Sequence, residues 1–209
     1  MITLYIGKSA SGKDSIVRNI LTINPSGAFN PIISYTNRPI RKGEKDGVDY
    51  HFVSKDIIEQ MMTDNRFVEH RTYHTINDGK PDTWCYGTPN LDLSKNWIGI
   101  VDVGGATTLI NVYGGNNFNI NYVETADDIR KSRAMLRGSF DEAEWDRRAA
   151  DDNVKFSDER INALQDLLNI SSTHINDICV INNSSDKPVF STWTQHLENK
   201  KTDEEEMEI

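Results

Sequence analysis

Two separated segments of this 209-residue chain carry residues suited to binding phosphate groups. The first, Gly7–Asp14, reads Gly-Lys-Ser-Ala-Ser-Gly-Lys-Asp and fits the pattern G-x-x-x-x-G-K. The glycines of such a loop let backbone N–H groups surround an anion, and Lys13 can reach the β and γ phosphates of a nucleotide. An apolar run precedes the loop and an amphipathic helical pattern follows it, so ATP binding is favoured over a chance glycine-serine turn.

The expected ATP contacts comprise the loop and the residues beside it: Gly7, Lys8, Ser9, Ala10, Ser11, Gly12, Lys13, Asp14 and Ser15. Asp14 stands where serine or threonine is usual after the lysine. A carboxylate there can ligate Mg²⁺ directly or through water, although it adds negative charge beside the phosphates. Ser15 is the alternative hydroxyl, so both residues are candidate magnesium ligands.

The second segment, Ser34–Phe52, presents two arginines around a proline. Pro39 fixes its own φ and biases Arg38 towards an extended conformation, so the segment is expected to be a strand or stiff loop. Arginine suits bidentate contact with phosphate, and a tyrosine hydroxyl can add a hydrogen bond. A second phosphate-bearing ligand is therefore expected here.

This segment resembles the monophosphate-binding segment of guanylate kinases. The family holds the GMP phosphate with a serine, two arginines and a tyrosine, and the matching residues are Ser34, Arg38, Arg41 and Tyr50. Phe67-Val-Glu69 and Tyr86-Gly87-Thr88 resemble two further family elements. The resemblance implies that Glu69 binds the guanine N1 and N2 edge and that Thr88 addresses O6. It also implies that Tyr86 joins the phosphate contacts and that Gly87 lies in the GMP site.

The sequence departs from the family at two places. Residues 70–85 separate Glu69 from Tyr86, a longer interval than usual, and a hairpin or loop over about 74–84 is expected to extend the rim of the base pocket. The family also carries two acids one residue apart and then Gln-Gly. Here Ile100 replaces the first acid and Gly104 replaces the glutamine, while Asp102 remains. Three roles stay open for Asp102: binding Mg²⁺, binding the guanine 2-amino group, or capping the next helix.

A group of arginines resembles the lid arginines of the family: Arg133, Arg137 and Arg148. Cations there can neutralise charge that builds on phosphoryl oxygens during transfer. Lys13, Arg38, Arg137 and Arg148 are the expected catalytic residues, and Arg133 and Arg137 are also expected to contact ATP. Because acids are interspersed, ordinary surface ion pairing is the competing reading, and we adopt it for Arg130 and Arg160.

Apolar runs alternating with helical patterns predict an α/β fold of three layers with a central parallel sheet, typical of P-loop enzymes. Strands are expected at Ile2–Ile6, Trp97–Val101, Phe118–Val123 and Asp177–Ile181, and helices at Ala106–Val112, Asp127–Leu136 and Asp186–Leu197. The predicted single domain spans 1–200. Its core is 1–33, 95–132 and 157–200, with a monophosphate-binding lobe at 34–94, a lid at 133–156 and an acidic disordered tail at 201–209.

Net charge, apolar runs and cysteine content limit which partners and which cellular compartment are expected. A net charge of −9 argues against a protein that coats nucleic acid, and no apolar run approaches the roughly 18 residues that span a bilayer. Two cysteines in unrelated surroundings and an N-terminus without signal-peptide features favour the cytoplasm. A monomer or a homodimer is expected.

The resemblance therefore implies transfer of a phosphoryl group from ATP, with Mg²⁺, to GMP or dGMP. One alternative is a kinase with a different or broader (deoxy)nucleoside monophosphate range, which the long interval and Ile100 would allow. Another is an inactive guanylate kinase-like module that binds a protein partner. The intact Gly12-Lys13 pair and the lid arginines argue against the module.

Overall fold

The computed structural model describes residues 1–24, 27–41, 43–77, 80–136, 140–173, 176–185 and 187–207. Its larger sheet has the strand order β10-β9-β8-β1-β7-β2. These strands are β10 (Val189–Thr192), β9 (Cys179–Asn182), β8 (Phe118–Glu124), β1 (Ile2–Ile6), β7 (Trp97–Ile100) and β2 (Asn30–Pro31). All neighbours pair in parallel except β10, which runs antiparallel to β9. The predicted parallel α/β sheet is confirmed.

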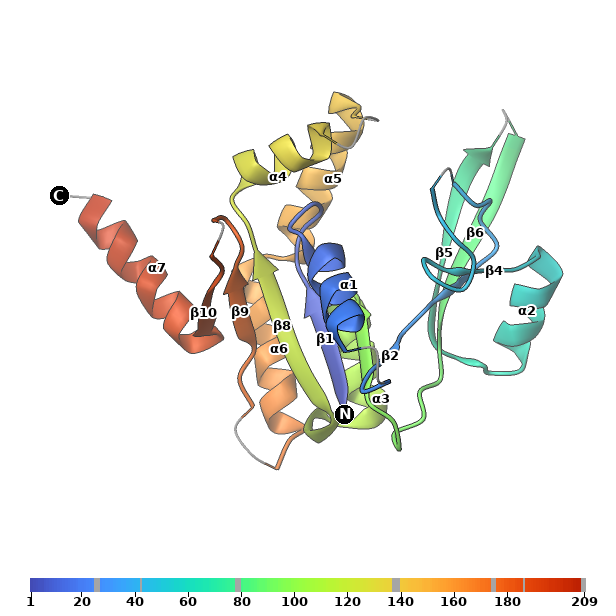
Figure 1. The fold of residues 1–209 in the computed structure, drawn as a ribbon, viewed down its shortest axis with the longest axis horizontal. Helices are drawn as coiled ribbons and strands as arrows, with labels where there is room; N and C mark the ends of the chain where they lie inside the picture. Colours follow the sequence, from blue (N-terminus) through green and yellow to red (C-terminus); the bar gives the residue numbers. More distant parts are fainter. Residues whose placement is uncertain are drawn as a thin grey trace.

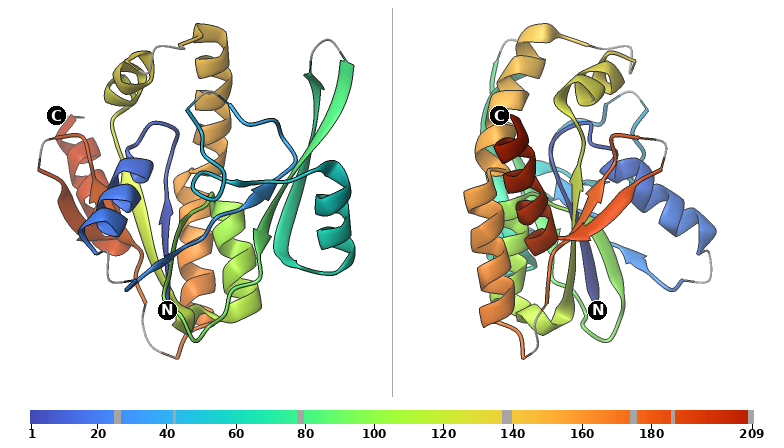
Figure 2. Two further views of the ribbon diagram at one scale, coloured as in Figure 1. Left: turned by 45° about the vertical axis from the view of Figure 1, so that its right-hand side comes forward. Right: turned by 90° about the vertical axis from the view of Figure 1, so that its left-hand side faces the viewer.

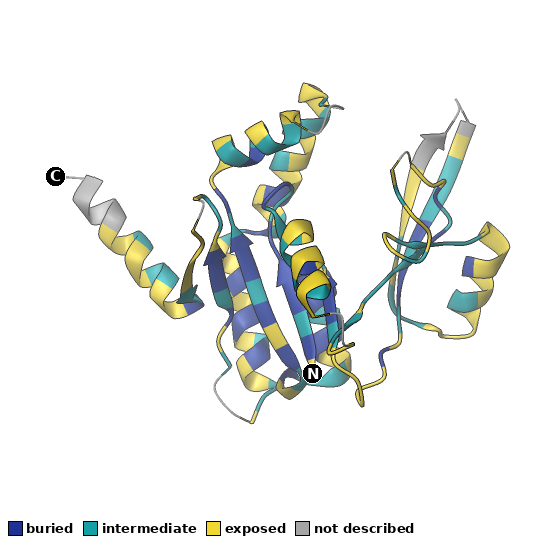
Figure 3. Ribbon diagram, in the orientation of Figure 1, coloured by how far each residue is buried: buried dark blue, intermediate teal, exposed yellow. Residues whose placement is uncertain are grey.

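Helices cover both faces of this sheet (Figure 1). The side chains of β1 alternate between the two faces, so each face receives apolar residues. Ile2, Leu4 and Ile6 pack with apolar residues of α3 (Val103–Tyr113) and α6 (Asp158–Ile170). Tyr5 faces the other way and packs with Val17 of α1 (Lys13–Ile23). Figure 2 shows α1 on one side of the sheet and α3 and α6 on the other, and Figure 3 shows the buried strands between them.

A second sheet of four strands, in the order β4-β3-β6-β5, lies beside the first and carries α2 (Lys55–Thr63). Its strands are β4 (His51–Phe52), β3 (Tyr35–Thr36), β6 (Lys80–Pro89) and β5 (Phe67–Asn77). The segment predicted as a hairpin or loop at 74–84 lengthens the antiparallel β5–β6 ribbon, in which Glu69 faces Thr88 and Arg71 faces Tyr86.

Two helices, α4 (Asp127–Met135) and α5 (Glu142–Lys155), lie beyond the carboxyl end of β1 (Figure 1). The Asp141 side chain accepts the Glu144 amide at the start of α5, and Ser157 does the same for Arg160 at the start of α6. A short 3₁₀ turn, η1 (Gly115–Asn117), leads into β8.

The C-terminal part differs from expectation. The helix predicted from Asp186 begins at Trp193, because the preceding Val-Phe-Ser-Thr run pairs with β9 as a strand. That helix, α7 (Trp193–Met207), then continues through residues 201–207, where a disordered tail was expected; glutamate is a good helix former. Within the described residues, no helix combines the length and the apolar character needed to cross a membrane.

Candidate active site

The loop between β1 and α1 has a conformation that requires its glycines. Gly7 has φ 145° and Gly12 has φ 98°, both in the region that disfavours side chains. A Cβ at Gly7 would lie 2.4 Å from the Val123 carbonyl oxygen, and one at Gly12 would lie 2.5 Å from Nδ2 of Asn183. Alanine at either position would therefore displace neighbouring atoms as well as strain the backbone.

Three side chains from other elements hold this loop through one buried carbonyl. The backbone carbonyl oxygen of Ser11 accepts hydrogen bonds from three side chains: Thr125 Oγ1 at 3.0 Å, Asn183 Nδ2 at 2.8 Å and Arg133 Nη1 at 3.2 Å. Arg133 also donates to the Asn183 carbonyl at 2.9 Å. Arg133 and Asn183 therefore hold the backbone of this loop at its Ser11 carbonyl.

Helix α5 contacts the same loop. The Ser9 amide donates to Oδ2 of Asp152 at 2.6 Å, and Lys8 Nζ donates to Oδ1 of Asn153 at 2.8 Å. Lys13 Nζ donates to the Lys8 carbonyl at 2.8 Å, so its ammonium lies inside the loop. A carboxylate therefore accepts one of the amide hydrogens that such a loop offers to phosphate.

Arg38 follows β3 and is buried, and it is not among the residues that line the cleft. Its side chain is 3% exposed, and its two terminal nitrogens bind both carboxylate oxygens of Glu44 at 2.8 and 2.9 Å. The guanidinium carbon lies 5.4 Å from the centre of the Tyr50 ring and 5.5 Å from that of Phe52. The hydrogen bond from Arg38 lowers the pKa of Glu44, so this partner, which sequence reasoning missed, stays ionised.

The base side of the cleft is built on the β5–β6 ribbon. Thr88 Oγ1 donates to Oε1 of Glu69 at 3.1 Å and lies 3.5 Å from the Ser34 hydroxyl. The structure thus brings together three residues that the resemblance had assigned to GMP. Gly87 has a packing role, since a Cβ there would lie 2.7 Å from ring atoms of Phe67.

Asp102 is the N-cap of α3 and the partner of Arg71. Its Oδ1 accepts the Gly105 amide at 2.9 Å and Arg71 Nη2 at 2.8 Å, and its Oδ2 accepts Arg71 Nη1 at 2.5 Å. Burial alone would raise the pKa of Asp102, but the bonds from Arg71 and Gly105 more than offset this, and the pKa lies below its usual value. Of the three open roles, helix capping is the one observed.

Magnesium fits the described residues poorly at Asp102, because both carboxylate oxygens already accept hydrogen bonds from a guanidinium. Asp14 and Ser15 lie exposed in the first turn of α1, which follows the phosphate loop. No group of three or more potential metal ligands occurs within the described ranges. An ion bound mainly by nucleotide phosphates, with Asp14 or Ser15 beside it, is the arrangement that these residues allow.

The arginines compared above with the lid of the family do not share one environment. Arg148 and Arg147 both bind Glu144, at 2.6 and 2.8 Å, and these bonds, led by those from Arg147, lower the pKa of Glu144 to about 2. Arg137 lies outside the described residues.

Arg130 contradicts the expectation of an ordinary surface residue. Its side chain is 1% exposed, and it donates to the Ser9 carbonyl at 2.9 Å and to Asp127 at 2.7 Å. Its apolar neighbour Trp145 covers the guanidinium, with 5.5 Å between the guanidinium carbon and the ring centre. It is a buried support of the phosphate loop, which no pattern in the local sequence marks.

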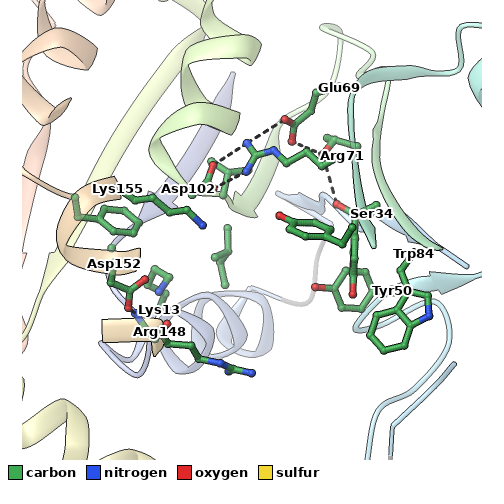
Figure 4. A pocket seen from close by; sticks show the side chains of 18 of the residues that line it. Lys13, Ser34, Tyr50, Glu69, Arg71, Trp84, Asp102, Arg148, Asp152 and Lys155 are labelled. Carbon is green, nitrogen blue, oxygen red and sulfur yellow. Dashed lines mark hydrogen bonds and ion pairs between the residues drawn. The ribbon is translucent and has the colours of Figure 1, made fainter. Parts of the chain in front are cut away.

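One cleft of about 880 Å³ is lined both by residues of the loop after β1 and by residues of the second sheet (Figure 4). The predicted site residues that line it are Gly7, Ser9, Lys13, Ser34, Arg41, Tyr50, Glu69, Tyr86, Thr88, Asp102 and Arg148. Sequence reasoning missed Arg71, Tyr73, Trp84, Asp152 and Lys155, which line it too. The period-two alternation of strands could have identified Arg71 and Tyr73 from Glu69, and Trp84 from Tyr86. Asp152 and Lys155 come from α5 and carry no comparable signal.

The family model and the sequence relatives agree on one family. A family model described as "Guanylate kinase" matches residues 2–79. A guanylate kinase of Chlorobium luteolum is 32% identical over 147 residues, which cover 68% of this chain and 70% of that protein. One of Histophilus somni is 37% identical over 102 residues, or 48% of this chain and 46% of that protein. A crystal structure of guanylate kinase from Anaplasma phagocytophilum covers 81% of this chain and 83% of its own, with 17% identity and a TM-score of 0.45.

Proposed function

This chain belongs to the guanylate kinase family, and we propose that it transfers the γ-phosphoryl group of ATP to GMP or dGMP, giving ADP and GDP or dGDP. The observation that carries this proposal is the shared cleft. Residues of the phosphate loop, such as Lys13, and residues of the second sheet, such as Tyr50 and Glu69, line the same cavity. Two phosphate-bearing ligands bound at its two ends would place donor and acceptor side by side.

Each end has a proposed task. Lys13 and the loop amides bind the ATP phosphates, and Mg²⁺ accompanies them near Asp14 and Ser15. Arg38, Arg41, Tyr50 and Tyr86 bind the acceptor phosphate. Glu69 and Thr88, already hydrogen-bonded to each other, bind the base.

The lid supplies mobile charge in this proposal. Arg148 leaves Glu144 to contact the phosphoryl oxygens as the cleft closes, and Arg137 acts with it. Closure also excludes water that would otherwise hydrolyse ATP.

We propose residues 34–94 as the monophosphate-binding lobe and 133–156 as the lid. Both cysteines are free thiols, which fits a reducing cytoplasm, and a monomer or homodimer is proposed.

The test measures ADP formation with GMP, dGMP, AMP, dTMP, CMP and UMP in turn, with Lys13→Ala as the inactive control. Turnover confined to GMP and dGMP supports the proposal. Comparable turnover of several nucleoside monophosphates supports the alternative of a kinase with a broader acceptor range. The long β5–β6 ribbon is the observation that favours this alternative. Absence of turnover with every acceptor overturns the enzymatic assignment in favour of a binding module.

A further inference from the structure

Arg71 occupies the centre of the base side of the cleft. It follows Glu69 by two residues on β5, so both side chains leave the same face of the ribbon. Its guanidinium lies between Asp102, at 2.5 and 2.8 Å, and Glu69, at 3.3 Å (Figure 4). One cation thus joins the two acids that face the proposed base site.

The space for this guanidinium comes from a glycine. A Cβ at Gly104 would lie 3.2 Å from Arg71 Nη2, and one at Gly105 would lie 3.3 Å from Oε1 of Glu69. The family pattern described above has glutamine where this chain has Gly104. A larger side chain there would meet Arg71, so Gly104 and Arg71 fit each other as a pair.

Arg71 has donors to spare and access to the cleft. Of its five N–H groups, the bonds found among the described residues use one on Nη1 and up to two on Nη2. Its side chain is 35% exposed and lines the cavity beside Glu69 and Thr88. A ligand edge that enters here therefore meets a fixed cation next to a carboxylate and a hydroxyl.

These groups select between purines. The 6-oxo and N7 atoms of guanine or hypoxanthine accept hydrogen bonds, and arginine is suited to both. Adenine presents a 6-amino donor, which would oppose the guanidinium. Both acids already accept hydrogen bonds. Among the described residues Asp102 accepts three, at 2.5 to 2.9 Å, whereas Glu69 accepts two longer ones, at 3.1 and 3.3 Å, so Glu69 keeps more acceptor capacity for a 2-amino group.

We propose that Arg71 is the specificity-determining residue of the acceptor site: it donates to the 6-oxo and N7 edge of a purine monophosphate, while Glu69 and not Asp102 binds the 2-amino group. This inference rests on the proposed function. It makes the 6-position the main point of discrimination, so inosine monophosphate, which has the 6-oxo group and lacks the 2-amino group, is expected to be an acceptor along with GMP.

The test compares GMP, IMP and AMP by kcat/KM and by calorimetric binding in the whole protein. Arg71→Met should lower the GMP-to-AMP preference about tenfold or more, and Arg71→Lys, which lacks the planar fork, should restore little of it. Gly104→Gln, which places a side chain against the guanidinium, should act in the same direction. Arg66→Met, an exposed arginine at the start of the same ribbon, is the control and should leave the preference unchanged.

The role of Asp102 is tested by a second quantity, the ratio of kcat/KM for GMP to that for IMP. These two substrates differ only in the 2-amino group. Asp102→Asn should leave this ratio within about twofold, whereas Glu69→Gln should reduce it severalfold. An unchanged GMP-to-AMP preference in folded Arg71→Met, or a GMP-to-IMP loss in Asp102→Asn equal to that in Glu69→Gln, overturns the inference. If the wild type binds purine monophosphates without turnover, the proposed function fails while the binding preferences still decide the role of Arg71. If it binds none of them, both fail.

Discussion

Arg71 of the second sheet binds both carboxylate oxygens of Asp102, the residue that caps α3 behind the central sheet. The two sheets are therefore linked by an ion pair at the cleft. Asparagine can still cap a helix, so Asp102→Asn removes the ion pair and keeps the cap, whereas Asp102→Ala removes both. We expect Asp102→Ala to lower the free energy of unfolding by about 1 kcal/mol more than Asp102→Asn, measured by urea denaturation.

The same pair predicts a pH dependence. The pKa of Asp102 is lower in the folded chain than its usual value of about 3.9. Its stabilising contribution is thus fully present above that value and is lost as the pH falls through the folded pKa. The stability difference between wild type and Asp102→Asn should be constant near neutrality and shrink in acid. A difference that grows as the pH falls would contradict this sign.

Glu44 is expected to stabilise the fold through Arg38. Glu44→Ala leaves a nearly buried guanidinium without its carboxylate, which should lower the free energy of unfolding by about 2 kcal/mol. The control is Glu59→Ala, because Glu59 pairs with Lys55 at 3.9 Å in an exposed helical position, where a loss below about 0.5 kcal/mol is expected. Equal losses in the two variants would show that the Arg38 contact has no special weight.

Asp152 is expected to oppose ATP binding. Its carboxylate accepts the Ser9 amide hydrogen and places a negative charge beside the phosphate loop. Asp152→Asn should tighten ATP binding severalfold in a calorimetric titration. Asp151→Asn removes the same charge one residue earlier, where the side chain faces Arg147, and should change the affinity little. Weaker ATP binding in Asp152→Asn would instead mean that the carboxylate supports the loop.

Lys13 is expected to act on charge in the transition state. Lys13→Ala should reduce kcat by at least about 100-fold, as removal of one preorganised donor commonly does, while the thermal midpoint changes little. Lys95→Ala, an exposed lysine 4.0 Å from Asp92, should retain full activity. A modest loss of kcat in Lys13→Ala would indicate that the arginines, and not Lys13, supply most of the electrostatic stabilisation.

Local patterns predicted the elements that carry the site. The run Ile2–Ile6, the glycine loop and the apolar face after Lys13 required no distant information, and β1 and α1 lie where the sequence indicated. Ser34, Glu69 and Thr88 were predicted together because the resemblance supplied their order, and the β3–β6–β5 pairing brings them into hydrogen-bond range.

Contacts between distant segments were beyond the reach of such patterns. Arg130 reads as one more cation among acids, and its burial depends on Trp145 and on the Ser9 carbonyl, which are remote in sequence. Asp152 looks like a solvated acid until α5 places it against the loop. Arg71 could have been predicted to face the cleft from alternation, but its bond to Asp102 depends on how the two sheets meet.

The geometry of the β5–β6 ribbon determines where residues can be inserted or deleted without disturbing the acceptor pocket. From Glu69 to Tyr73 its cleft-facing side chains alternate with outward ones, so a single-residue insertion in that interval would turn the later side chains of β5 to the opposite face. Residues added in matched pairs beyond His74 and Thr83 would keep the register nearer the base. We therefore expect related chains to differ in the number of residues at the outer end of the ribbon and to keep the same number near Glu69.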